Sequence, residues 1–217
     1  MNNMLRYFNV FILLFFVFGL FAGCDDSGTN NDDTLIMPLG VGNLWRGTLW
    51  TFDETGEVLF EQSSDYHISE SNYYNGKIWY IVDQITDGDT ASAVFIFRNE
   101  SDGLYTRYST DTLAALTSLW AKFPASVGDH YYSGPGNIKE VTVTATDTVV
   151  ETVYSEYICN VYKHELTVYT WPIYDKYYLA PNIGFAKIER YLADIDGQLY
   201  LYQRWVLELF EKASSSE

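Results

Sequence analysis

The sequence predicts a mainly β protein built from antiparallel, meander-type sheets. Three observations support this prediction: short turn signals recur along the chain, the apolar residues between them alternate with a period of two, and long helical patterns are absent. Hairpin turns join antiparallel strands, whereas parallel strands need long crossover segments. We therefore expect a β-rich domain over residues 35–212, followed by a disordered tail over 213–217.

Turn signals separate the expected strands. Each combines a glycine with Asp, Asn or another residue that tolerates a tight turn, which is typical of a hairpin. These signals lie at 53–56, 74–76, 87–89, 101–103 and 196–197.

Alternating apolar residues indicate which strand faces are buried. Val141, Val143 and Ala145 alternate with threonines. Near the C-terminus one strand face carries Leu199, Leu201, Trp205, Leu207 and Leu209. Such a period of two predicts strands with one face against the core.

Residues 112–123 are ambiguous. Leu113, Leu116, Trp120 and Phe123 fit one stripe of a helix, yet 119–123 reads equally well as a strand. Of the two we expect a short helix here.

A short motif occurs twice. Residues 38–45 and 124–131 both read P-x-x-V-G-[ND]-x-aromatic, and strand-like sequence follows each copy. The glycine suits a turn conformation that other residues avoid, and the aromatic residue begins the next strand. The repeat predicts two related β-halves, 35–115 and 116–212, packed as a sandwich or an open barrel.

The N-terminus has the three regions of a signal peptide. Arg6 supplies positive charge, residues 10–22 form an apolar run too short to span a bilayer, and small residues lead into Cys24. This ending resembles the lipobox of bacterial lipoproteins, although Phe21 departs from the usual aliphatic residue. The resemblance implies cleavage between Gly23 and Cys24, which removes residues 1–23 and leaves Cys24 acylated.

The segment after the cysteine is a tether. Residues 24–34 begin with the lipidated cysteine and continue almost entirely polar and acidic, so they have too little apolar surface to fold. Several acyl chains, palmitate among them, would hold the protein on a membrane. Acidic residues directly after the lipidated cysteine, here Asp25 and Asp26, retain lipoproteins at the inner membrane in some bacteria. In other bacteria they resemble a signal for export to the cell surface. We expect the outer membrane, with the periplasmic or surface face left open.

Three segments together resemble uncharacterised bacterial envelope lipoproteins. Residues 37–45 match "PL-x-VGN-x-W", 123–129 match "FP-x-x-VGD", and 177–187 match "YY-x-x-x-x-IG-x-x-K". The resemblance covers most of the mature chain. It implies a class of envelope protein and no activity, because that group has none established.

Charge and cysteine content exclude several functions. Without Arg6 the chain carries 12 basic and 29 acidic residues, a formal charge near −17. Nucleic acids and anionic membrane surfaces need basic partners, so we expect neither. With Cys24 acylated, Cys159 has no disulfide partner and is expected to be a small buried residue.

No catalytic, metal or cofactor site is predicted. His67, His130 and His164 stand apart from other ligands, and 87–89 and 194–197 lack the further oxygens of a calcium loop. Nucleophile elbows and nucleotide-binding loops are also missing. A catalytic pair of carboxylates remains an open possibility, because the sequence does not give the distance between two carboxyl groups. We expect a protein that is not an enzyme.

Two main functions remain. The first is a structural or interaction lipoprotein that docks to another envelope protein through aromatic surface. The second is a carrier that closes its sheet around a lipid or other apolar small molecule. A hydrolase of envelope polysaccharide is a weaker third. The docking hypothesis draws on the tryptophans, Trp45, Trp50, Trp79, Trp120, Trp171 and Trp205.

Overall fold

A computed structural model describes residues 35–107, 116–167 and 172–214 of the chain. The signal peptide, Gly23, Cys24 and the tether lie outside these residues, as do 215–217 of the expected tail. Within the described ranges, no helix is both long and apolar enough to cross a bilayer.

The described residues form β-strands and one short 3-10 helix, η2 (Pro135–Asn137). The strands are β1 (Leu44–Phe52), β2 (Val58–Tyr74), β3 (Lys77–Thr86), β4 (Asp89–Glu100), β5 (Gly103–Arg107), β6 (Thr117–Lys122), β7 (His130–Ser133), β8 (Lys139–Glu151), β9 (Glu156–Leu166), β10 (Tyr174–Ala180), β11 (Gly184–Ala193) and β12 (Leu199–Glu211).

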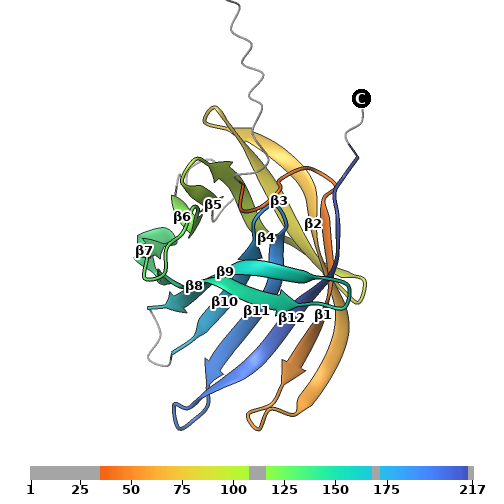
Figure 1. Ribbon diagram of the computed structural model, residues 1–217, viewed down its shortest axis with the longest axis vertical. Coiled ribbons are helices and arrows are strands. Elements are labelled where there is room, and N and C mark those ends of the chain that lie inside the picture. Colours follow the sequence, from red (N-terminus) through yellow and green to blue (C-terminus); the bar gives the residue numbers. More distant parts are fainter. Residues whose placement is uncertain (1–34, 108–115, 168–171, 215–217) are drawn as a thin grey trace, which may run out of the picture. The chain divides into compact units, whose positions relative to one another are not determined.

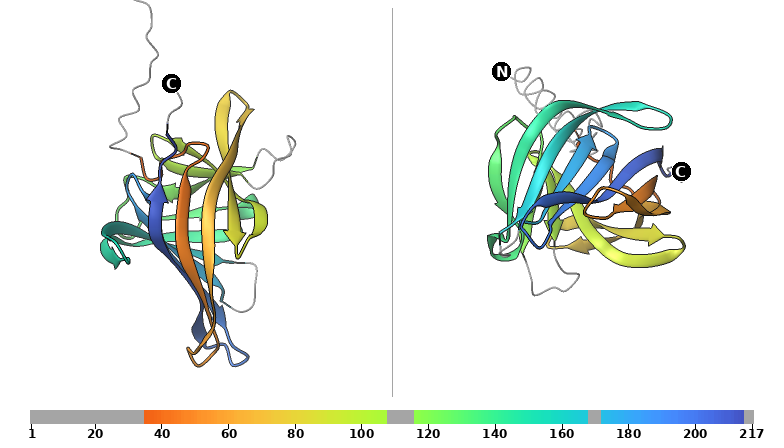
Figure 2. Two further views of the ribbon diagram at one scale, coloured as in Figure 1. Left: turned by 90° about the vertical axis from the view of Figure 1, so that its right-hand side faces the viewer. Right: turned by 90° about the horizontal axis from the view of Figure 1, so that it is seen from below.

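All twelve strands belong to one antiparallel sheet, in the order β6-β5-β4-β3-β2-β1-β12-β11-β10-β9-β8-β7. Two meanders therefore meet at the β1–β12 pair. The sheet curls until β6 and β7 come near each other, so that it is nearly closed as an open barrel (Figures 1 and 2). The predicted mainly β, antiparallel fold is confirmed, and of the two packings proposed the barrel is the one found.

Side chains join the two edges where the backbone ladder stops. The hydroxyls of Ser118 and Ser133 lie 3.1 Å apart. The Tyr131 hydroxyl accepts a hydrogen bond from the Lys122 amide at 3.0 Å and donates one to the Trp120 carbonyl at 3.3 Å. These contacts occupy polar groups that an open sheet edge would leave unpaired.

The predicted hairpin turns are confirmed. They connect β1 to β2, β2 to β3, β3 to β4, β4 to β5 and β11 to β12. Aspartates stabilise two of them locally. Asp53 Oδ1 accepts from the amides of Thr55 and Glu57 at 2.8 and 2.9 Å, and Asp194 Oδ1 accepts from the amides of Asp196 and Gln198 at 2.9 and 2.7 Å.

The two copies of the repeated motif make the same turn. Gly42 and Gly128 have φ values of 91° and 90°, a region that favours glycine. Their amides donate to the carbonyls of Ile68 and Val143 at 2.8 and 2.9 Å. Each turn leads into the first strand of a meander, β1 or β7. The sheet order groups β6 with β5, so the meanders divide after residue 122.

The prediction of a helix over 112–123 is wrong where the structure describes it. Residues 117–122 form β6, which pairs with β5, and 112–115 lie outside the described residues. Trp120 explains the difference. Its ring is buried against Phe97 and Tyr177, with centroids 4.9 and 4.6 Å away. Packing inside the barrel therefore outweighs the weak helical stripe.

Large aromatic side chains fill one part of the barrel interior. The indole Nε1 atoms of Trp45 and Trp205 donate to the carbonyls of Ile183 and Ser64 at 2.5 and 2.6 Å, so these buried rings leave no polar atom without a partner. The fully buried residues of this cluster include Trp45, Trp120, Trp205, Phe97, Phe185, Tyr162, Ile68, Leu104 and Leu179.

A smaller cluster lies on the outer face of the sheet. The long β8–β9 hairpin bends across that face (Figure 1). Cys159 and Val150 from the hairpin are buried in the same cluster as Tyr178 and Ala186 of β10 and β11. The second apolar face of these strands is thus covered by the chain's own hairpin.

Candidate functional site

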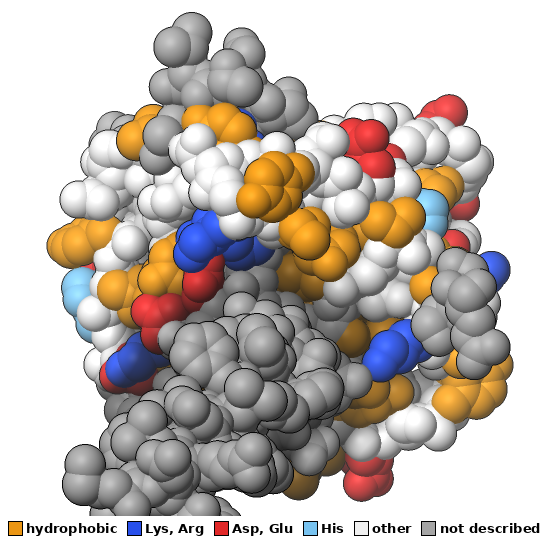
Figure 3. Space-filling view, turned by 90° about the horizontal axis from the view of Figure 1, so that it is seen from above, with side chains coloured by type: hydrophobic (Ala, Val, Ile, Leu, Met, Phe, Trp, Pro, Cys, Tyr) orange, Lys and Arg blue, Asp and Glu red, His pale blue; other side chains and the backbone are white. Residues whose placement is uncertain are grey.

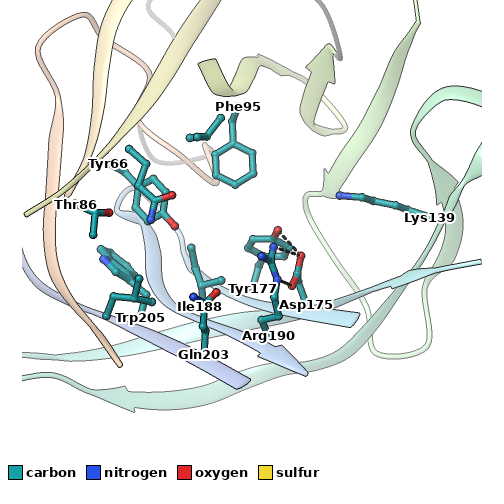
Figure 4. A pocket seen from close by; sticks show the side chains of 13 residues that line it. Tyr66, Thr86, Phe95, Lys139, Asp175, Tyr177, Ile188, Arg190, Gln203 and Trp205 are labelled. Atoms are coloured by element: carbon teal, nitrogen blue, oxygen red, sulfur yellow. Dashed lines mark hydrogen bonds and ion pairs between the residues drawn. The ribbon is translucent and has the colours of Figure 1, made fainter. Parts of the chain in front are cut away.

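A cavity of about 530 Å³ lies inside the curled sheet, next to the aromatic cluster (Figure 4). Eight strands contribute to its wall. The lining residues are Leu49, Tyr66, Gln84, Thr86, Val94, Phe95, Lys139, Asp175, Tyr177, Ile188, Arg190, Gln203 and Trp205.

The cavity arises because inward-facing positions change from apolar to polar along the strands. On β10 every second residue faces inward, and the series runs from buried Leu179 through Tyr177 to Asp175. On β8 the series runs from buried Val141 to Lys139. A carboxylate and an ammonium need water or polar partners, so the interior there is not filled by apolar side chains.

A hydrogen-bonded pair of side chains, a carboxylate and a guanidinium, forms part of the cavity wall. Asp175 and Arg190 are direct neighbours across the β10–β11 ladder. Arg190 Nε and Nη2 donate to the two Asp175 oxygens at 2.8 and 3.2 Å. The Tyr177 hydroxyl donates to Asp175 at 3.2 Å. The hydrogen bond to Asp175 raises the pKa of Arg190, which keeps the guanidinium charged.

Lys139 brings a second cation to the cavity. Its side chain extends from β8 with the ammonium end directed inward (Figure 4). Burial lowers the pKa of Lys139, the Arg190 charge lowers it further, and the Asp175 charge opposes both. The two cations thus line the cavity with one described carboxylate, Asp175, which Arg190 already binds.

Aromatic and aliphatic side chains form the opposite wall. The Tyr66 ring lies 5.2 Å from the Trp205 ring and 6.1 Å from the Phe95 ring, centroid to centroid. Burial raises the pKa of Tyr66, so its hydroxyl stays protonated. In Figure 4 these rings lie across the cavity from Lys139 and Arg190. The cations and the aromatic rings thus lie on different sides of the cavity, and Thr86 lies beside Tyr66 and Trp205.

His164 lies at the border between the aromatic cluster and the cavity. Its ring is packed between Trp120 and Tyr177, each 4.9 Å away between centroids. Neither ring nitrogen has a hydrogen-bond partner among the described residues. Burial holds the pKa of His164 well below its ordinary value, so the ring is neutral at pH 7.

The structure separates the other residues that the sequence analysis considered. His130 pairs with Glu140 on the surface at 2.9 Å between Nε2 and Oε1. Among the described residues, no three His, Cys, Asp or Glu side chains lie close enough together to hold a metal ion. Cys159 is fully buried, as predicted, and burial raises the pKa of its thiol to about 12.

The tryptophans do not form the aromatic docking surface that the sequence suggested. Trp45, Trp79, Trp120 and Trp205 are each at most 1% exposed, Trp50 is half-buried, and Trp171 lies outside the described residues. That interpretation is wrong for the four buried rings, because the closed sheet places them in its interior or beneath neighbouring side chains. On the face in Figure 3, hydrophobic side chains lie scattered among polar ones.

The sequence analysis did not single out Lys139, Asp175 or Arg190. One signal was present: Asp175 and Lys139 continue, in steps of two, series of otherwise apolar positions. A charge at the end of such a series also reads as a strand leaving the core for solvent. The sequence therefore did not distinguish a cavity from an exposed strand end.

Comparisons with known proteins add a fold likeness alone. No family model and no curated protein matches the chain. Two solved structures are similar over 82% of it. One is a presumed exported protein with a YmcC-like fold from Bacteroides fragilis, at 16% identity and a TM-score of 0.49 over 100% of that chain. The other is a presumed lipoprotein from Parabacteroides distasonis, at 13% identity and a TM-score of 0.46 over 99% of that chain.

Proposed function

We propose that this chain is a lipid-anchored envelope protein that binds a small molecule inside its barrel. The observation that supports this most is the cavity of about 530 Å³, which has the size of ordinary small-molecule sites. Its lining combines aromatic and aliphatic side chains with polar and charged ones that can orient a ligand. Of the two functions that the sequence left open, the cavity favours the carrier.

The anchor in this proposal rests on the sequence. The signal-peptide pattern and the lipobox-like ending place an acylated Cys24 at the mature N-terminus. A polar tether then separates the membrane from the barrel. We expect the outer membrane as the location, and no nucleic-acid partner because of the net charge of −16.

Binding is favoured over catalysis by the charges in the cavity. Hydrolysis of a glycosidic bond ordinarily uses two carboxyl groups. Asp175 is the one carboxylate among the lining residues that the structure describes, and Arg190 holds both of its oxygens. A polysaccharide hydrolase therefore has little support in this cavity.

Native mass spectrometry tests the binding function. The mature protein would be purified from the bacterial envelope and compared with two variants on β12. Gln203→Trp fills the cavity, whereas Val206→Trp adds the same ring on the opposite strand face, where Val206 pairs with Lys187. We expect a bound species on the wild type and on Val206→Trp that is lost from Gln203→Trp. A wild type without ligand, or equal retention by both variants, would overturn the proposal.

The anchor has its own test. Cys24→Ser removes the acceptor of the acyl chains, so the protein should move from the detergent phase to the aqueous phase in a phase-partition assay. An unchanged distribution would show that the lipoprotein assignment is wrong while leaving the cavity proposal intact.

A further inference from the structure

We infer that the ligand of the cavity carries an acidic group, a carboxylate or a phosphate, on an apolar body, and that Lys139 and Arg190 bind the acid. This inference rests on the proposed binding function and names its ligand class. It follows from the charge balance of the lining, from the separation of the cations from the aromatic rings, and from the contrast with the outer face.

The cavity contains more positive than negative charge. Lys139 and Arg190 line it together with one described carboxylate, Asp175. Asp175 makes two hydrogen bonds with Arg190, and Lys139 forms no ion pair with a described residue. The whole chain has a net charge of −16, so a surplus of positive charge inside it is unusual. A ligand anion would compensate it.

The buried carboxylate on the outer face of the sheet is matched by cations. Glu189, on the outer face of β11, accepts hydrogen bonds from the hydroxyls of Tyr178 and Tyr191 at 2.9 and 3.1 Å. Its carboxylate also lies 3.3 Å from Lys187 Nζ and 3.2 Å from Arg204 Nε. That cluster needs no ligand, whereas the ammonium of Lys139 is left without a carboxylate of its own.

Burial has a measurable consequence for Lys139. Removal from water lowers the pKa of this group, which means that its charged form is stabilised less well in the cavity than in solvent. A bound anion next to the ammonium reverses this effect. Because both charges lie where water is partly excluded, their attraction is stronger than on the surface.

An exposed aromatic side chain continues the inner face beyond the cavity and suits an apolar tail. Gln203, Thr51 and Phe60 lie in one row across β12, β1 and β2, and Gln203 lines the cavity. Phe60 is 65% exposed on this same face. An apolar chain leaving the cavity along this row would cover the Phe60 ring.

Probes with one tail and different head groups test the inference. Dodecanoate, dodecyl phosphate, dodecanol and dodecyltrimethylammonium would be titrated below their micelle concentrations into the mature chain carrying Cys24→Ser. Calorimetry gives the affinities, and the intrinsic tryptophan fluorescence, to which Trp205 in the cavity wall contributes, gives a second signal. We expect an acid to bind about tenfold or more tightly than dodecanol, and the cation to bind most weakly.

A matched pair of variants locates the effect. Lys139→Met removes the cavity ammonium, and Lys176→Met removes an ammonium from the opposite face of β10, with the same change in net charge. Lys139→Met should abolish the preference for the acid over the alcohol, and Lys176→Met should retain it. Lys139→Gln gives a second, polar replacement in case the methionine variant misfolds.

The outcomes separate this inference from the function on which it rests. Equal binding of all four head groups to the wild type would overturn the acidic ligand and leave a binding cavity. An acid preference that survives in both Lys139 variants would overturn the role of Lys139. Failure of every probe to bind, together with a ligand-free native mass, would overturn the proposed function itself. The ratio of dodecanoate to dodecyl phosphate affinity distinguishes a carboxylate from a phosphate.

Discussion

The barrel interior has a filled region and a hollow region, built from the same strands. In the filled region the Phe185 ring packs against both Trp45 and Trp120, and all three side chains are almost fully buried. In the hollow region the wall includes Asp175 and Arg190, and a space of about 530 Å³ remains. Several strands, among them β10, β11 and β12, run through both regions, so the side chains that they turn inward decide which part is filled.

The difference shows how a sheet of this kind separates stability from binding. Buried aromatic rings contribute large apolar areas and specific ring contacts, which stabilise the fold. Groups in the hollow region remain partly hydrated and contribute less to stability, which leaves them available for a ligand. Function can therefore change at the cavity while the filled region keeps the barrel closed.

Two positions on β12 give the largest contrast between the regions. Leu207 is fully buried in the filled region, and Gln203 lines the cavity four residues earlier on the same face. We expect Leu207→Ala to lower the free energy of unfolding by about 2–5 kcal/mol, because it leaves a void in packed surroundings. Gln203→Ala should change it by about 0.5 kcal/mol or less. Urea unfolding of the mature chain measures both.

The same two variants can also contradict the division of the interior into a filled and a hollow region. A loss for Gln203→Ala as large as that for Leu207→Ala would mean that the glutamine is part of the packed interior. The division into a filled and a hollow region would then be wrong.

The contact between the edge strands β6 and β7, the seam of the barrel, should have the next largest effect on the free energy of unfolding. Tyr131→Phe removes the hydroxyl that accepts from the Lys122 amide and donates to the Trp120 carbonyl. Leaving these two backbone groups without that partner should cost about 1–3 kcal/mol in the free energy of unfolding. Tyr132→Phe is the control, because this neighbouring side chain is half exposed. Equal stability of the two variants would show that packing alone closes the seam.

Much of the fold was predictable because local chemistry determines it. Asp-Gly and Asn-Gly turns fix where a hairpin reverses, as at residues 87–88 and 75–76, and alternation identifies the inward face of β8 at Val141 and Val143. The strand conformation of residues 117–122 was not predictable, because contacts of Trp120 with distant strands determine it.

The candidate site was harder to predict because a bulge sets its pairing. Hairpin β10–β11 pairs Ala180 with Gly184, and an unbroken ladder from there would place Asp175 opposite Glu189. A register shift between Tyr178 and Leu179 places Asp175 opposite Arg190 instead. A bulge has no reliable local signal in one sequence, so the ion pair of the cavity could not be read from residue spacing.

His164, at the border of the two regions, should give the smallest effect. Burial depresses its pKa in the folded state, whereas the unfolded chain takes up a proton near the ordinary value of 6.5. The contribution of His164 to stability is therefore fully present above pH 6.5 and is lost as the pH falls below it. Between pH 7.5 and 5.5 the free energy of unfolding should drop by about 1.4 kcal/mol from this group.

Replacing the ring isolates that contribution from other titrating groups. His164→Leu keeps an apolar side chain in a fully buried position and removes the proton acceptor. Urea unfolding at the two pH values should show a smaller pH dependence for this variant than for the wild type, by about the same 1.4 kcal/mol. An identical pH dependence of the two proteins would mean that His164 is protonated in the folded state. The ring would then belong to the hydrated, hollow region instead of the filled one.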